Sequence, residues 1–201
     1  MGELVRQLAV NELHPELRSR GFIRDGSTWN RRASGFVQVI NVQSSQWNSR
    51  GNESCTVNLG IFWEKVRRIC WQKPPSRFAR EVDCLVRVRI GRLLDEKRDR
   101  WWALAEAEDV KPASEEILEL LESDGLPWLE NFKSLRELHD LLAAGEDDTN
   151  VPGLRRIYLA IVKAEMGDKK GANAILLERT SQAWQERAEI VREALQLGDA
   201  A

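Results

Sequence analysis

The clearest pattern of hydrophobic and polar positions lies in residues 36–63 and predicts two β-strands joined by a polar loop. Successive side chains of a strand point to opposite faces of its sheet, so residues of one parity share a face. In the second strand the apolar parity consists of Cys55, Val57, Leu59, Ile61 and Trp63. The other parity consists of Thr56, Asn58, Gly60 and Phe62. The pattern predicts that the first of these faces lies in the hydrophobic core.

The first strand of the pair combines β-branched residues with amides. One parity consists of Phe36, Gln38, Ile40 and Val42, and the other consists of Val37, Val39, Asn41 and Gln43. Buried amides cost free energy unless they are hydrogen-bonded or hydrated. We therefore expect that the face carrying Asn41 and Gln43 is not dry along its whole length.

Further strands are expected on both sides of this pair. Asp25-Gly26 is a strong turn signal between short strands at residues 22–24 and 28–31. Residues 81–94 contain another strand, in which apolar side chains alternate with arginines until Gly91 ends it. Residues 64–80 have the pattern of a long connection that covers a sheet edge.

Helical periodicity dominates both ends of the chain. Residues 3–20 form a helical pattern in which Pro15 would introduce a kink or divide the helix in two. After the last strand the chain is expected to remain helical. The expected helices are residues 114–125, stopped by Gly125 and Pro127, residues 128–142, and a hairpin of residues 154–166 with a long second arm at 170–197.

These elements predict an α+β fold, with an N-terminal helix on a mostly antiparallel sheet followed by a helical C-terminal half. The acidic break at residues 145–148 is a candidate domain boundary. It divides the chain into an α+β domain, residues 1–145, and a helical C-terminal extension, residues 146–201, packed on that domain.

Composition narrows the class of protein. Charged residues make up 31% of the chain, the hydrophobic set makes up 42%, and the formal net charge is -2, so no global field attracts nucleic acid or lipid. No apolar run approaches the roughly 20 residues that a membrane helix needs. Cys55, Cys70 and Cys84 are odd in number and widely spaced, which favours reduced, half-buried thiols over a disulfide or a metal site. We expect a soluble cytoplasmic protein that does not act at a membrane.

Several stretches in a fixed order carry a family resemblance. They are GFIRDGSTWNRR, VINVQSSQW, TVNLGIF, VRIGRL, WW and GLPWL, of which residues 41–45 and 57–60 are the most specific. Over residues 3–145 the chain resembles the bacterial domain-of-unknown-function family catalogued as 4304. The resemblance implies a domain extent, a strand order and a bacterial cytoplasmic origin. It implies no activity and no catalytic residue.

A polar sheet face is the main candidate site. The candidate ligand-binding residues are Asn41, Gln43, Asn58, Arg87 and Arg89, with Trp29 or Trp47 as an aromatic wall. If the amide and arginine faces coincide, they would cradle a carboxylate, a phosphate or a peptide backbone, because arginine binds planar anions through two hydrogen bonds. The alternative is a solvated face whose amides bond to one another across the strands.

Other chemistries have weaker support. His14 and His139 are the only histidines, and no sequence motif places either beside Cys84 or Ser44 as a base, so we expect no catalytic residue, no metal and no cofactor. Residues 63–80 mix basic and aromatic side chains, as single-stranded nucleic acid binding requires. The same composition fits a loop with buried tryptophans and solvated arginines, so a nucleic acid partner is not favoured.

The function expected from the sequence is a non-catalytic binding or interaction module. Its polar sheet face would recognise a protein, a peptide or a small anionic ligand. Two alternatives remain: a hydrolase or transferase that uses the same face, and an immunity-type inhibitor of a toxin.

Overall fold

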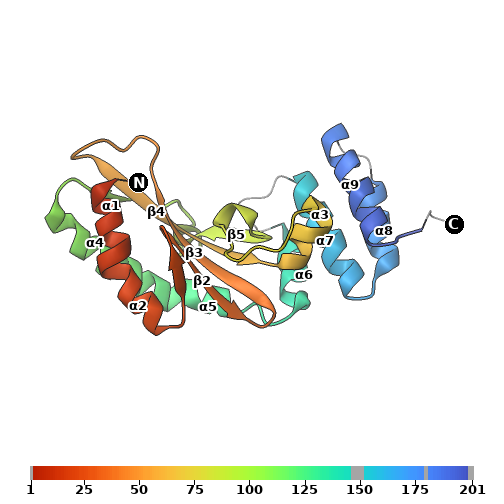
Figure 1. Ribbon diagram of the computed structural model, residues 1–201, viewed down its shortest axis with the longest axis horizontal. Helices are drawn as coiled ribbons and strands as arrows, with labels where there is room; N and C mark the ends of the chain where they lie inside the picture. Colours follow the sequence, from red (N-terminus) through yellow and green to blue (C-terminus); the bar gives the residue numbers. More distant parts are fainter. Residues whose placement is uncertain (1, 146–151, 179–180, 199–201) are drawn as a thin grey trace.

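The computed structural model describes residues 2–145, 152–178 and 181–198 and shows the predicted α+β fold (Figure 1). An N-terminal helix packs on an antiparallel sheet, and a helical C-terminal half follows. The strands are β1 (Ile23–Asp25), β2 (Thr28–Ala33), β3 (Phe36–Ser44), β4 (Glu53–Phe62), β5 (Val86–Arg89) and β6 (Trp102–Leu104). The helices are α1 (Glu3–Gln7), α2 (His14–Ser19), α3 (Glu64–Trp71), α4 (Val110–Leu120), α5 (Leu126–Glu130), α6 (Leu135–Ala144), α7 (Pro152–Glu165), α8 (Lys169–Leu177) and α9 (Gln182–Ala194).

The described strands form one sheet with the order β1-β2-β3-β4-β5, and β6 pairs with the other end of β4. All of these pairings are antiparallel. Strand β6 lies in a region for which the sequence predicted only helix, so that prediction was wrong. The strand has only three residues, too few for an alternating pattern to be recognised.

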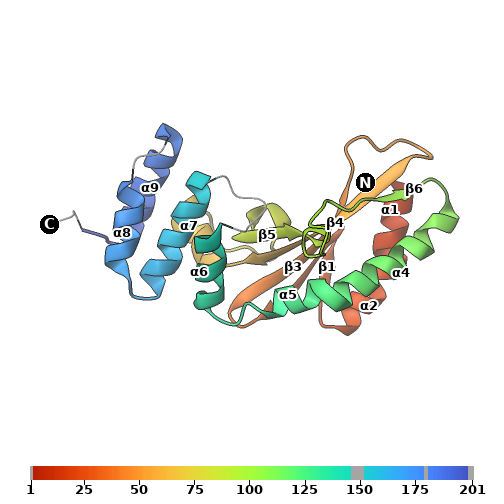
Figure 2. The ribbon, with the colours of Figure 1, turned by 180° about the vertical axis from the view of Figure 1, so that it is seen from behind.

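One face of the sheet, which we call the helix-covered face, packs against the N-terminal helical run and α4–α5 (Figure 2). Its core side chains include Ile40, Val57 and Leu59, which have no exposed surface. A β-carbon on Gly125 would lie 3.3 Å from Cδ1 of Leu59, so the missing side chain lets the α4–α5 run approach β4 closely. The predicted burial of the apolar stripe is confirmed for Cys55, Val57, Leu59 and Ile61, whereas Trp63 follows the end of β4 and is half-buried.

Gly125 and Pro127 do not stop the helix beneath the sheet, contrary to the sequence prediction. The π-helical turn Leu121–Gly125 joins α4 to α5, and Gly125 has a right-handed helical conformation with φ of -68°. Pro127 lies in the first turn of α5, where the absence of an N–H group is best tolerated. At the N-terminus, a π-helical segment, Leu8–Leu13, similarly joins α1 to α2 just before Pro15.

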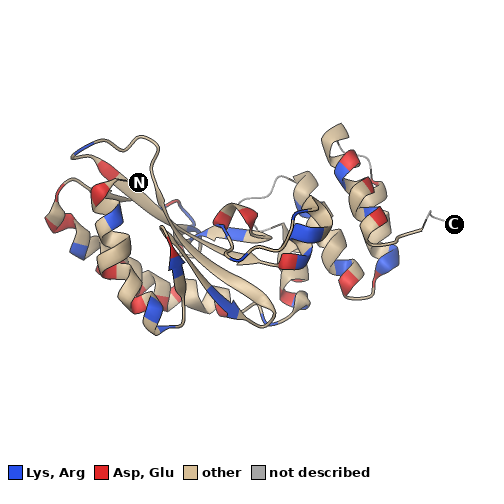
Figure 3. Cartoon of the chain, viewed as in Figure 1, with Lys and Arg blue, Asp and Glu red and all other residues tan. Residues whose placement is uncertain are grey.

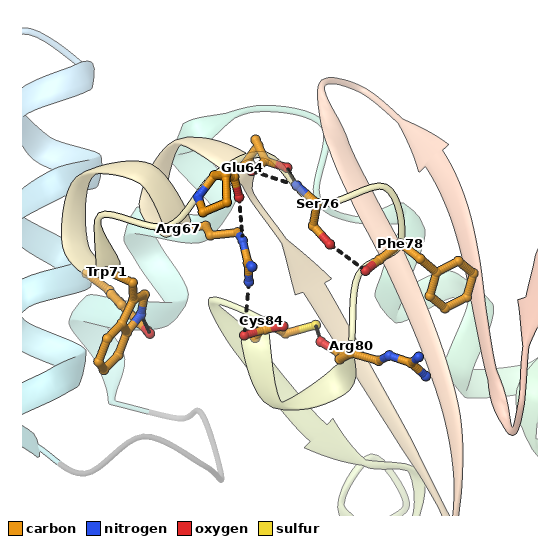
Figure 4. Close-up of polar contacts among 10 residues, drawn as sticks. Glu64, Arg67, Trp71, Ser76, Phe78, Arg80 and Cys84 are labelled. Atoms are coloured by element: carbon orange, nitrogen blue, oxygen red, sulfur yellow. Dashed lines mark hydrogen bonds and ion pairs between the residues drawn. The ribbon is translucent and has the colours of Figure 1, made fainter.

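Residues 64–80 were predicted to be a connection along a sheet edge, but they begin with the helix α3. This helix ends where Gln72 adopts a left-handed conformation with φ of 51°. The chain then crosses the second face of the sheet, which we call the strap-covered face. We call residues 73–84 the strap (Figure 4). Buried side chains of the strap and the sheet form a second core cluster, made of Val37, Val39, Phe62, Ala79 and Cys84. The strap therefore covers a face rather than an edge.

The C-terminal helices contact the α+β part through α3 and α6. The Trp71 indole N–H donates to the Tyr158 hydroxyl at 3.1 Å, and Arg187 donates to the carbonyl of Cys70 at 2.7 Å. The long arm predicted at 170–197 is wrong, because α8 ends at Leu177 and α9 is a separate helix. The proposed boundary at residues 146–148 lies outside the described residues. No helix in the described ranges has the length and apolar character needed to cross a membrane.

Candidate functional site

The register of the sheet brings the predicted amides and arginines to the strap-covered face. Asn41 lies opposite Asn58 in the β3–β4 pair, and Asn58 lies opposite Arg89 in the β4–β5 pair. Arg87 lies opposite Gly60 on the same face. Together with strap residues they surround a cavity of about 640 Å³, which we call the polar hollow. It is lined by Ser27, Thr28, Asn41, Gln43, Asn58, Arg80, Glu81, Val82, Arg87 and Arg89.

Amides that bond to one another form the floor of the polar hollow. The Nδ2 group of the buried Asn58 donates to Oε1 of Gln43 at 2.9 Å and to Oδ1 of Asn41 at 3.3 Å. The Nδ2 group of Asn41 donates to Oγ1 of Thr28 at 2.9 Å. These bonds satisfy the Nδ2 group of the buried Asn58, and they fix the orientation of the floor before any ligand binds.

Arginines from two elements form the walls. Arg87 on β5 pairs with Glu81 of the strap at 2.7 Å, Arg89 pairs with Asp99, and Arg80 pairs with Asp25 at 2.7 Å. In Figure 3 the basic residues of β5 lie beside the acidic turn at residues 81–83. The lining itself contributes three guanidinium groups and one carboxylate, and Asp25 and Asp99 pair with two of these arginines from outside the lining.

Neither tryptophan proposed from the sequence lies at the polar hollow. Trp29 is fully buried and lies opposite Ile40, on the helix-covered face, where its indole N–H donates to Nδ1 of His14 at 3.3 Å. Trp47 lies in the β3–β4 loop with 81% of its surface exposed. They therefore do not form the expected aromatic wall. Trp101, which the sequence reasoning missed, lies 5.6 Å from the Arg89 guanidinium, measured to the ring centroid.

Thr28, Arg80 and Glu81 were also missed as lining residues. Thr28 could have been found, because it follows the Asp25-Gly26 turn and has the parity that faces the amides. Arg80 and Glu81 could not, because their position depends on the path of the strap across the sheet, which no local pattern encodes.

The thiols and histidines do not form a nucleophilic site in the described part of the chain. All three cysteines are free and buried. Burial raises the pKa of Cys55 and of Cys70 to about 12, and it raises the pKa of Cys84 well above its ordinary value. Desolvation lowers the pKa of His14, aided by the charge of Arg24. The described residues contain no cluster of three or more potential metal ligands.

Part of the basic charge in residues 63–80 is already paired. Lys65 pairs with Glu165, and Arg67 pairs with Asp83 at 3.4 Å. Trp71 packs beneath the Arg187 guanidinium, 4.7 Å from the ring centroid. These interactions leave less charge and less aromatic surface for nucleic acid than the sequence suggested.

Comparison with known proteins gives one family match. The model of a family described as a domain of unknown function, DUF4304, matches residues 13–131. This segment includes the described sheet and every lining residue of the polar hollow. No curated protein and no solved structure matches the chain.

Proposed function

Because the chain belongs to the DUF4304 family, a domain of unknown function, we propose its function from its geometry: a non-catalytic module that binds an anionic group of a small ligand or a peptide in the polar hollow. The observation that carries this proposal is the convergence of Arg80, Arg87 and Arg89 above a floor of amides. Guanidinium groups match the planar oxygen pairs of carboxylates and phosphates.

Preorganisation supports binding. The pair with Asp99 uses Nη1 of Arg89, and the neighbouring Trp101 ring also restricts that side chain. A guanidinium has five N–H donors, so one carboxylate partner can orient it without occupying its full donor capacity. Gln43 is exposed and accepts from Asn58 through Oε1, so its Nε2 group is not used in that bond. A ligand would therefore meet side chains that are already oriented, which reduces the entropic cost of binding.

Binding has more support than catalysis. Glu81 is the one carboxylate among the described lining residues, and it is held by Arg87. The lining includes no histidine and no cysteine. A hydrolase or transferase would need a general base or nucleophile at the ligand. We also propose a reducing, cytoplasmic location, which the three free, buried thiols support, and a bacterial origin, which rests on the family resemblance alone.

Titration with inorganic phosphate and with citrate, followed by ¹H–¹⁵N NMR, tests the proposal. We expect saturable shifts centred on Asn41, Asn58 and Arg89 for at least one of the two anions. Arg89→Gln should weaken that binding by about tenfold, the usual scale for losing one charged hydrogen bond. The matched control is Arg92→Gln, because Arg92 shares the partner Asp99 at 3.0 Å but does not line the hollow. No saturable shift with either anion, or equal weakening by both substitutions, would contradict the proposal.

A further inference from the structure

The strap divides its face of the sheet into two hollows, and the second has a different chemistry. This cavity, which we call the apolar hollow, has a volume of about 330 Å³, within the range of small-ligand sites. Its apolar lining is contributed by Val37, Phe62 and Ala79, together with Ile23 on the edge strand β1. Ile23 keeps 63% of its surface exposed, so the rim is open to an incoming apolar group.

The apolar hollow is already formed. The Ala79 amide donates to Oδ1 of Asn30 at 2.7 Å, and Nδ2 of Asn30 donates back to the Ala79 carbonyl at 3.0 Å. At the strap's start, the Ser76 amide donates to the Glu64 carboxylate at 3.2 Å (Figure 4). These contacts hold the wall of the hollow in place, so a ligand need not order it.

Two arginines from different elements line the apolar hollow without a counter-charge. Arg32 comes from β2, Arg77 comes from the strap, and both are exposed. Among the described residues, neither forms an ion pair or a side-chain hydrogen bond. Arg31 also lines the hollow, but it pairs with Glu130 at 2.8 Å. The polar hollow differs, because each of its arginines has an acidic partner.

We propose that the apolar hollow binds a carboxylate attached to an apolar body. Arg32 and Arg77 would bind the carboxylate, and the apolar body would cover Val37, Phe62 and Ile23. Burial of that body stabilises the complex in proportion to the apolar surface removed from water, and the arginines select for the charged end. Two sources share this chemistry: a free fatty acid and the C-terminal residue of a peptide with an apolar side chain. This site is independent of the polar hollow.

NMR titration of the full chain tests the proposal with octanoate and with a short peptide that ends in a free leucine carboxylate. Octanol and the same peptide with an amidated end are the matched neutral probes. We expect shifts at Val37, Phe62 and Ala79 for at least one acid, with its neutral counterpart binding at least about tenfold more weakly. Binding of octanoate alone would assign a fatty acid, and binding of the peptide alone would assign a C-terminus.

Variants separate a specific site from general attraction. Arg32→Gln combined with Arg77→Gln should weaken acid binding by more than tenfold and leave binding of the neutral probe unchanged. Both residues are exposed, so the variant should fold, and circular dichroism checks this. Arg6→Gln removes an exposed cation from α1 and should change nothing. Shifts that map elsewhere, equal binding of acid and neutral probes, or wild-type affinity in the double variant would overturn the proposal.

Discussion

The two faces of the central sheet arise from the same strands, yet they have opposite characters. On the helix-covered face, Ile40 and Leu59 lie opposite each other and are fully buried. One residue further along, Asn41 and Asn58 lie opposite each other beneath the polar hollow. The first face is covered by a long helical run, and the second is covered only in part, by a strap of irregular chain. The helix-covered face therefore supplies most of the buried apolar contacts, and the strap-covered face is able to carry polar groups.

The strap-covered face is itself divided. In its centre, Val39 and Cys84 pack tightly, and a β-carbon on Gly60 would lie only 2.7 Å from Sγ of Cys84. On either side of this contact the sheet is hollowed. The tight centre therefore positions the strap, and the hollows are the places where it does not reach the sheet.

The largest expected effect is on the helix-covered face. Leu59→Ala should lower the free energy of unfolding by about 2–5 kcal/mol, because it leaves a cavity in the core. Leu177→Ala, at a residue with 48% exposed surface, is the control and should have little effect. Urea unfolding measures both. An unchanged midpoint for Leu59→Ala would show that this face is not the stabilising one.

A smaller effect is expected where the strap is attached to the sheet. Asn30→Ala removes both hydrogen bonds to Ala79 and should cost about 1–3 kcal/mol, because it leaves buried backbone groups unpaired. Hydrogen exchange should accelerate in the strap and stay unchanged in the α4–α5 run. The exposed Asn52→Ala is the control. Equal acceleration of hydrogen exchange in the strap and in the α4–α5 run would contradict the separate roles of the two faces.

The smallest effect concerns pH and the buried thiol of Cys70. Its pKa is about 12 in the folded protein, above that of an ordinary thiol, so the unfolded chain loses this proton first as pH rises. The resulting stability is complete below pH 9 and is lost as pH rises toward 12. Between pH 8 and pH 10, wild type should lose roughly 1.5 kcal/mol more stability than Cys70→Ala. If the free energy of unfolding of the two proteins falls in parallel with pH, the claim that Cys70 is buried and protonated is contradicted.

The sequence could predict the face of each strand residue but not the partner that each residue meets. The parity of Asn41, Asn58 and Arg89 followed from side-chain alternation, and so did the burial of Leu59. Trp29 was proposed as an aromatic wall without a parity argument, and the alternation in fact puts Trp29 on the face opposite Thr28 and Asn41. No local pattern could show that residues 73–84 cross the sheet. The positions of Arg77 and Arg80, and the existence of both hollows, therefore could not be predicted without the tertiary structure.

The central claim is that the amides and arginines of the strap-covered face bind an anion, and a double variant tests it most directly. Asn58→Ala combined with Arg89→Ala removes one floor group and one wall group of the polar hollow. Citrate or phosphate affinity, whichever binds wild type, and the free energy of unfolding are measured on the same sample. We predict that binding falls by more than about tenfold while helix content is retained. Wild-type affinity in the double variant would contradict the claim. So would a loss of more than about 2 kcal/mol in the free energy of unfolding with binding retained in the folded fraction, because these residues would then be structural.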